Sequence, residues 1–456
     1  MSSEELTPQE QLNQLLKVYY QDKPGVSTEK ELELRYGLGE NYITKTQFNN
    51  VINKLRGSGF ILINKEGDYT LRINPMTRGR SGFINQSFIR AEINELNNIQ
   101  HYCKTDYFDV VNIPDHINLI QKRRAILNKK ADKKNPGKTI FEFVKPVDFY
   151  NSNFRVNYKQ EKKLSQEDKV LQSVLKEWPT SQKIYRYLKR YRFKIPNMPF
   201  EIHCSIVKTS KQKKSRGRSI YIAENNVQES NVFNNPENYE IELEFNEDEM
   251  NKMVISKANE DSYKTSSCEI HNKIIMNIIK KYTKVILSGI QSTNYPIRYD
   301  EQTSVLKQYL KLSYINKYVT NVKGKKRKPM MTLEKLLKDE FAWKRKNRMN
   351  FIGPSSVSLE MKHIVLTDNK NAPNINNYYT VTEKADGERH LLYINEIGKI
   401  YLLDINLNIK FTGCTIGDER LHDTIFDGEL VLFNKMGNFI NNFLIFDMYV
   451  SKKKRF

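Results

Sequence analysis

The amino-acid sequence has no apolar stretch of about 18 residues and no N-terminal signal pattern, so it predicts neither a membrane-spanning nor a secreted protein. The seven histidines form no H-x-x-x-H pattern, which argues against a zinc site. The four cysteines lie far apart, in no metal-binding spacing, and suit a reducing cytoplasm; they are Cys103, Cys204, Cys268 and Cys414. At 456 residues, the chain is long enough for two or three hydrophobic cores.

Positive charge is abundant instead. Lysine and arginine number 74 against 53 aspartates and glutamates, which gives a net charge of +21 and a pI of about 9.4. Basic clusters recur at residues 208–218, 323–328 and 452–455. Each cluster alone is typical of a solvated loop or tail. Together they indicate an anionic partner such as a polynucleotide, and we expect residues 323–328 to strengthen RNA binding through counterion release.

Residues 383–390 read EKADGERH and contain the motif K-x-D-G-x-R, which runs from Lys384 to Arg389. A lysine amine is protonated and inert at neutral pH unless cations or burial lower its pKa, and Arg389 with a bound metal would do so. Two further elements follow, D-G-E-L at 427–430 and the buried-strand pattern F-L-I-F-D at 443–447. The first motif alone also fits a charged turn, but the three elements together indicate covalent chemistry at the lysine.

These motifs resemble the covalent nucleotidyltransferase superfamily, which contains mRNA capping guanylyltransferases and ATP-dependent ligases. In that family the lysine takes a nucleoside monophosphate from a nucleoside triphosphate and passes it to a polynucleotide 5′ end. The resemblance implies that Lys384 is the nucleophile and that Arg389 contacts the nucleotide. It also implies that Glu429 serves the metal or the sugar and that Phe446 packs on the base.

Two strand patterns in the first part of the chain carry rows of glutamate. A period of two places Glu31 and Glu33 on one face of the first strand. The second strand places three carboxylates on one face, namely Glu240, Glu242 and Glu244. Same-face carboxylates lie about 7 Å apart and repel one another unless water or cations compensate them. One such strand is typical of an exposed face, but two indicate oxygen ligands for a hard divalent ion.

Basic residues share a face on strands between the acidic ones. Arg155 and Lys159 do so on one strand, and Arg186, Arg190 and Arg192 do so on the next. A closed barrel with both kinds of strand facing inward would hold a metal at one wall and a triphosphate at the other. This arrangement predicts a phosphohydrolase. A solvated RNA-binding face is the alternative for the arginines.

The paired E-x-E and E-x-E-x-E strands and the segment IYRYLKRYRF resemble the tunnel-type, metal-dependent RNA triphosphatases of fungi and large DNA viruses. The resemblance implies that the five glutamates bind Mg²⁺ or Mn²⁺ and that Lys208 joins the phosphate-binding residues. The sequence departs from the family at Leu188, where viral relatives tend to carry a lysine, and at His203, where an acidic residue is usual.

The expected fold is α+β. Residues 1–290 are predicted to form an antiparallel β-barrel, the triphosphate tunnel, with a covering helix between Ile270 and Ile286. Residues 291–350 are expected to be a basic, partly helical connector, and residues 351–456 to be part of an ATP-grasp-like nucleotidyltransferase sheet. Strands are predicted at Phe154–Glu161, Ile184–Phe193, Phe200–Lys208 and Tyr239–Phe245.

A triphosphatase module followed by a guanylyltransferase module resembles the multifunctional capping enzymes of nucleocytoplasmic large DNA viruses. The resemblance implies 5′-triphosphate RNA and GTP as substrates and a cytoplasmic (viral factory) or virion location. A cap methyltransferase, as a fused domain or a subunit, is a further implied partner. An ATP- or NAD-dependent nucleic-acid ligase and a non-catalytic RNA-binding scaffold remain alternatives.

Family members follow the F-D strand with an acidic strand, an α-phosphate lysine and usually an oligonucleotide-binding lobe. The chain stops at Phe456, nine residues after Asp447. We therefore expect the sequence to be part of a longer polypeptide, competent as a triphosphatase but poor at forming the Lys384 adduct, because a misplacement of about 1 Å can cost a hundredfold in rate.

Overall fold

A computed structural model divides the chain into two compact units, residues 1–292 and 293–456. It describes residues 6–25, 27–39, 41–78, 84–108, 113–131, 139–215, 218–258, 267–313, 358–366, 374–376, 379, 381, 383–451 and 454–455. The basic cluster at 323–328 and most of the expected connector, residues 314–350, lie outside the described residues. Within the described residues, no helix is long and apolar enough to cross a membrane.

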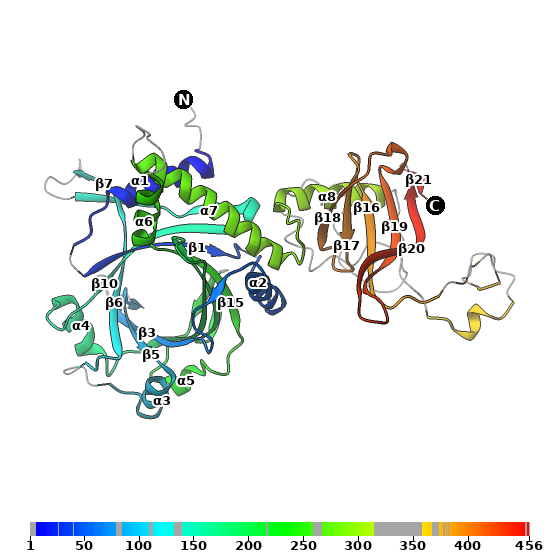
Figure 1. Ribbon diagram of the computed structural model, residues 1–456. Helices are drawn as coiled ribbons and strands as arrows, with labels where there is room; N and C mark the ends of the chain where they lie inside the picture. The colour runs from blue at the N-terminus through cyan, green and yellow to red at the C-terminus, as the bar shows by residue number, and fades with distance from the viewer. Residues whose placement is uncertain are drawn as a thin grey trace. The chain divides into compact units, whose positions relative to one another are not determined.

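The first unit is a closed antiparallel β-barrel (Figure 1). Strand β3 pairs with β5 on one side and with β11 on the other, and this second pairing closes the ring. The eight strands of the ring, in order, are β11 (Lys183–Lys194), β12 (Phe200–Thr209), β15 (Asn238–Phe245), β1 (Thr28–Tyr36), β10 (Phe154–Lys163), β6 (Ile117–Arg124), β5 (Ile89–Asn94) and β3 (Asp68–Arg78). The barrel and the four strands expected from the sequence are confirmed.

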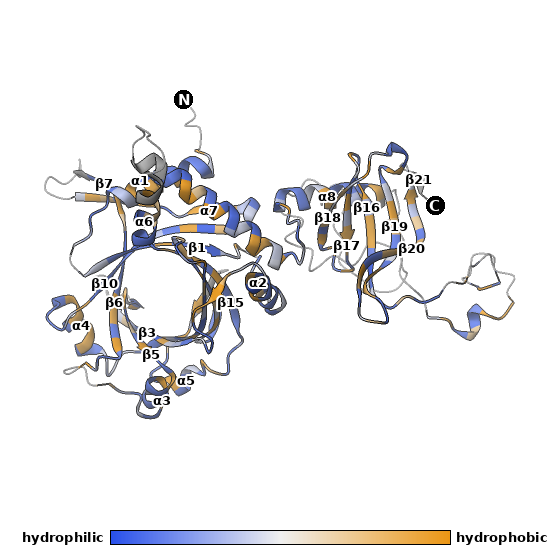
Figure 2. Cartoon of the chain, viewed as in Figure 1, coloured by the Kyte–Doolittle hydropathy of each residue, from blue (hydrophilic) through white to orange (hydrophobic). Residues whose placement is uncertain are grey.

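Smaller strands extend or flank the ring. They are β2 (Ile61–Leu62), β4 (Ile84–Gln86) and β9 (Val147–Phe149), with two separate hairpins, β7 (Ile126–Ala131) with β8 (Thr139–Phe143) and β13 (Gln212–Ser215) with β14 (Arg218–Tyr221). The barrel strands alternate between apolar and polar residues, and Figure 2 shows both colours along them. Leu32 and Leu34 of β1 are buried on the outer face, whereas Glu31 and Glu33, which alternate with them, face the lumen.

Helices cover the apolar outer face of the barrel. They are α1 (Pro8–Gln21), α2 (Lys45–Gly57), α3 (Leu96–Thr105), α4 (Lys169–Glu177), α5 (Val227–Ser230), α6 (Glu247–Ala258) and α7 (Ser267–Ile290). Helix α1 begins at a capping box, in which Thr7 and Glu10 satisfy each other's backbone N–H groups. The outer residues of β3 and β5 pack against α3 and α4 in one core cluster, which includes Trp178. The expected covering helix is confirmed as α7.

The second unit contains a six-stranded antiparallel sheet in the order β18-β17-β16-β19-β20-β21. Its strands are β16 (Glu388–Ile394), β17 (Lys399–Leu403), β18 (Ile409–Thr415), β19 (Thr424–Phe433), β20 (Phe439–Ser451) and β21 (Lys454–Arg455). Helix α8 (Tyr299–Ser313) shares a core with this sheet, where Tyr309 and Leu310 are buried beside Tyr393 and Tyr401. Residues 293–313 were expected to be part of a connector, and this is corrected because their apolar face completes the core of the second unit.

The close approach of α2 and α7 gives a test of barrel packing. A Cβ atom on Gly289 would lie 2.6 Å from the Cα atom of Val51. Gly289→Ala should therefore push the helices apart and lower the free energy of unfolding of the first unit by roughly 1–3 kcal/mol. Gly57→Ala is the matched control, because no atom lies within 4 Å of its new Cβ. Equal effects in urea-induced unfolding would contradict this packing.

Candidate functional site

Glutamates of β1 and β15 form an acidic wall inside the barrel. Glu33 lies directly opposite Glu244 in the strand register, and Arg35 lies opposite Glu242. Burial, followed by repulsion from Glu31 and Glu33, raises the pKa of Glu244 well above its ordinary value. Burial also raises the pKa of Glu31. The structure thus brings together the two acidic strands that the sequence predicts, and their carboxylates repel one another.

Three of these glutamates each lie near one basic partner. Glu31 binds Lys122 at 2.8 Å, Glu33 lies 3.6 Å from Lys159, and Glu242 lies 3.6 Å from Arg190. Among the residues that the structure describes, no group of three or more His, Cys, Asp or Glu is arranged to hold a metal ion.

Glu240 differs most from its expected role as a metal ligand. One of its carboxylate oxygens accepts a hydrogen bond from Arg35, and the other accepts one from Arg186. Its side chain is only 5% exposed, and both arginines bind it within the acidic wall. The structure assigns Glu240 to an Arg–Glu–Arg bridge, because two guanidinium groups occupy the oxygens that a cation would need.

Arginines form the facing wall of the lumen. Arg186 of β11 lies opposite Arg72 of β3, and Arg190 donates a hydrogen bond to Ser205 at 3.2 Å. Burial lowers the pKa of Arg72 despite the opposing effect of Glu92, and the nearby Arg90, Arg190 and Arg186 lower it further. Arg192 binds Asp68 at 2.9 Å. These cations crowd one side of the barrel, which suits an anion with several charges.

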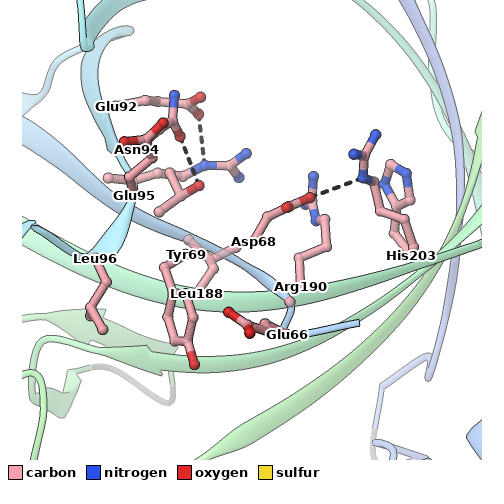
Figure 3. Close-up of a pocket in the computed structure, with 14 residues that line it drawn as sticks. Glu66, Asp68, Tyr69, Glu92, Asn94, Glu95, Leu96, Leu188, Arg190 and His203 are labelled. Carbon is pink, nitrogen blue, oxygen red and sulfur yellow. Dashed lines mark hydrogen bonds and ion pairs between the residues drawn. The ribbon is translucent and has the colours of Figure 1, made fainter. Parts of the chain in front are cut away.

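A cavity of about 740 Å³ lies against this wall (Figure 3). Figure 3 shows Asp68, Glu92, Arg190 and His203 around it, and Leu188 also lines it. Both departures from the family pattern, Leu188 and His203, therefore face the cavity. The Nε2 atom of His203 lies 3.4 Å from Glu201, whereas its Nδ1 atom is buried with no hydrogen-bond partner. Burial lowers the pKa of His203, so the ring is neutral near pH 7.

A ladder of ion pairs, which was not expected from the sequence, connects the two walls. Its members, in order, are Arg72, Glu92, Arg90, Glu161, Lys122 and Glu31. Burial raises the pKa of Glu161, but Arg90 and Lys122 outweigh that effect and hold the pKa at about 2. The alternation of Arg90 and Glu92 in the segment IRAEIN was the available signal, because a period of two places both on one strand face.

Two of the predicted phosphate-binding residues have other partners. Lys208 lies on the outer face of β12, opposite Tyr187, and its amine donates a hydrogen bond to the carbonyl of Phe233. Its expected role in phosphate binding is therefore corrected. Arg155 lies on the lumen side opposite Arg35, but it is bound to Asp148 at 2.6 Å.

In the second unit, Lys384 is 87% exposed and donates a hydrogen bond to Asp386 at 3.0 Å. This bond, with the charge of Asp386, raises the pKa of Lys384. Arg389 binds the buried carboxylate of Asp427 with both Nε and a terminal nitrogen. The Tyr449 hydroxyl donates a third hydrogen bond to Asp427, at 2.7 Å.

The other nucleotide-binding candidates lie on neighbouring strands. Glu429 pairs with Arg389 across β19 and β16, and its charge contributes to the raised pKa of Lys384. Gly387 is required at this point, since a Cβ there would lie 2.4 Å from the carbonyl oxygen of Leu430. Phe446 lies on β20 and is 49% exposed. The structure therefore brings Lys384, Asp386 and Glu429 together, with an accessible aromatic ring on the same sheet.

Comparisons with known proteins bear on both units. Residues 315–455 match the family model described as mRNA capping enzyme, catalytic domain. A probable mRNA-capping enzyme of Acanthamoeba polyphaga mimivirus is 28% identical over 163 residues, which cover 36% of this chain and 11% of that protein. The relative comes from a large DNA virus, and this chain spans only a small part of its length.

Two solved structures are also similar. The mimivirus capping enzyme triphosphatase matches with a TM-score of 0.32 and 16% identity, covering 54% of this chain and 93% of that one. The Schizosaccharomyces pombe RNA triphosphatase Pct1 matches with a TM-score of 0.30 and 11% identity, covering 61% of this chain and 93% of that one.

The low pKa of Glu161 predicts a pH-dependent contribution to stability. A carboxyl group whose pKa is lowered by folding stabilises the fold above its unfolded pKa, and this stabilisation is lost as the pH falls through the folded pKa. Glu161→Gln should lower the free energy of unfolding by roughly 2–4 kcal/mol at pH 7. The difference from the unmodified protein should shrink between about pH 5 and pH 2. A difference that stays constant over that range in urea-induced unfolding would contradict the ladder.

Proposed function

We propose that the barrel hydrolyses the γ-phosphate of 5′-triphosphate RNA and leaves a 5′-diphosphate end. The observation that carries this proposal is the pair of opposed walls inside one closed ring. Glu33 and Glu244 lie in register on one side, and Arg72, Arg186 and Arg190 gather on the other. A triphosphate has the charge to match the arginines, and its terminal phosphate would lie toward the carboxylates.

Four of the glutamates fit a divalent ion of the Mg²⁺ or Mn²⁺ type. Glu31, Glu33, Glu242 and Glu244 offer only oxygen donors, which such ions prefer, and the raised pKa of Glu244, caused by burial and by repulsion from Glu31 and Glu33, supports a cation at this wall. When bound, the ion would neutralise the γ-phosphate and the leaving oxygen. Arg186 and Arg190 would orient the phosphates, and a carboxylate of the acidic wall would orient the attacking water.

We further propose that the second unit carries out GTP:RNA guanylyl transfer through a phosphoramide on Lys384. The neutral amine would attack the α-phosphorus of GTP, with the bond to pyrophosphate breaking, and the GMP would then pass to the diphosphate end made by the barrel. Lys384 must first lose a proton and its hydrogen bond to Asp386. Glu429 lies close enough to affect its charge, and Phe446 offers a ring for the base.

The sequence match to a protein of a large DNA virus supports our proposal that the protein works in the cytoplasm of an infected cell or in the virion. A capping role also implies a cap methyltransferase, as a separate subunit or a fused domain, that acts on the capped product. That match spans 11% of the relative's length, so the activities of the whole relative enter here only as proposals.

The triphosphatase proposal is tested by phosphate release from γ-labelled 5′-triphosphate RNA with Mg²⁺ or Mn²⁺. Glu33→Ala and Glu242→Ala should each lower the rate by at least about a hundredfold without unfolding the barrel, because each removes a carboxylate from the acidic wall. Glu29→Ala is the control, since Glu29 lies on the same strand but is 71% exposed and paired with Lys163. Near-normal hydrolysis by either lumen variant at saturating metal would contradict the site.

The state of Lys384 predicts how adduct formation depends on pH. Because Asp386 raises the pKa of Lys384, the fraction of neutral amine should rise about tenfold per pH unit from pH 7 to pH 9. We expect a low yield of labelled GMP adduct at pH 7, an increase with pH, and none from Lys384→Ala. Stoichiometric adduct at pH 7 with a rate independent of pH would contradict the raised pKa. An AMP adduct would assign the unit to a ligase.

A further inference from the structure

The β7–β8 hairpin leaves the barrel at the end of β6 and extends outward from its wall (Figure 1). It pairs with no other strand among the described residues. Its register places Phe141 opposite Lys129 and Phe143 opposite Ile126. Phe141 and Phe143 are two residues apart, so they share one face of the hairpin, and they are 46% and 39% exposed. We call this face, which contains Ile126, Lys129, Phe141 and Phe143, the hairpin face.

The hairpin face continues a row of lumen residues. Lys122 of β6 binds Glu31 inside the barrel, and Arg124, two residues later, lies on the same side, opposite the lumen residue Lys159. The guanidinium carbon of Arg124 lies 5.8 Å from the centre of the Phe143 ring. Basic lumen residues and the hairpin face therefore form one continuous surface, which begins in the acidic and basic walls and ends outside the barrel.

A further exposed ring lies beside this row. The backbone N–H of Lys122 donates a hydrogen bond to the carbonyl of Phe88, whose side chain is 75% exposed. Rings on an ordinary solvated surface are normally scattered singly, because exposed apolar area carries no benefit there. Here Phe143 lies beside Arg124 and Phe141 lies opposite Lys129, and the backbone of Phe88 is hydrogen-bonded to that of Lys122, so three exposed rings and several cations occur near the end of β6.

We infer that the hairpin face binds the single-stranded RNA segment that follows the 5′ end held in the barrel. Single-stranded nucleic acids are held by this combination: a basic track that follows the backbone and aromatic rings on which bases stack, whatever their sequence. The positive charge of the track disfavours an apolar protein partner and favours a polyanion. The inference rests on the proposed function, because the barrel must hold the 5′ phosphates for the strand to leave along β6.

The test compares long and short substrates. The double variant Phe141→Leu with Phe143→Leu keeps the apolar volume and removes the rings. It should raise the KM for a 20-nucleotide 5′-triphosphate RNA about tenfold and lower the affinity for the same RNA with a 5′-hydroxyl end by a similar factor. Hydrolysis of a triphosphate-ended dinucleotide should not change, because that substrate does not reach the hairpin. The double variant with tryptophan at both positions should restore RNA binding.

Two control variants distinguish a specific role of the hairpin face from a general effect of losing exposed aromatic rings. Tyr42→Leu and Tyr107→Leu remove rings that are 65% and 58% exposed elsewhere on the same unit, and they should leave RNA affinity unchanged. Unchanged RNA affinity in the double leucine variant would overturn the inference and leave the hairpin to another partner. Equal losses on long and short substrates would also overturn it. If the unmodified protein releases no phosphate, the proposed function fails, but the fluorescence anisotropy of labelled 5′-hydroxyl RNA still decides the hairpin's role.

Discussion

The pairing of β3 with β11 is the constraint on which the first unit depends. It joins the two ends of the sheet, so the ring has no open edge and every second side chain must point into a confined lumen. Charged residues at those positions cannot turn away to solvent, and a buried charge is costly unless it is paired. The ion-pair ladder and the Arg35–Glu240–Arg186 bridge follow from this requirement. Pairing is incomplete at Glu33, whose basic partner Lys159 lies 3.6 Å away, and at Glu244, whose pKa is raised by burial and by neighbouring carboxylates.

Incomplete pairing is what makes the lumen suitable for a ligand. An arginine already bound to a carboxylate binds a phosphate only by exchanging partners, and the exchange costs little where the original contact is long. Arg190 lies 3.6 Å from Glu242, and Lys159 lies 3.6 Å from Glu33, whereas the contacts of Glu161 and Glu240 are short. The long contacts flank the acidic wall, and the short ones lie along the ladder and in the Arg35–Glu240–Arg186 bridge. The barrel thus separates residues that hold the ring from residues that remain available for a triphosphate and a cation.

The sequence predicted the features that depend on local periodicity. A period of two identified β10, β11, β12 and β15 to within a few residues, and it placed the glutamates on one face. It did not predict partners, because these depend on the stagger between strands and on side-chain rotamers. Lys208 shows a further limit: it lies five residues after His203, an odd number, so both cannot face the lumen of a regular strand. Arg90 and Glu92 were missed because β5 is short and otherwise apolar.

The two proposed reactions differ in how firmly the structure holds the side chains that would carry them out. In the barrel, the ring closure holds the charged walls in place, and the proposed reaction requires binding of substrate and cation with exchange of the long Arg190 and Lys159 contacts. In the second unit, the buried carboxylate of Asp427 binds Arg389 and Tyr449 and so links β16, β19 and β20. Lys384 precedes β16 and is exposed, with Asp386 as its partner. Its reaction therefore requires a change of partner as well as substrate binding, and a nucleotide phosphate that displaced Asp386 would remove the contact that keeps the amine protonated.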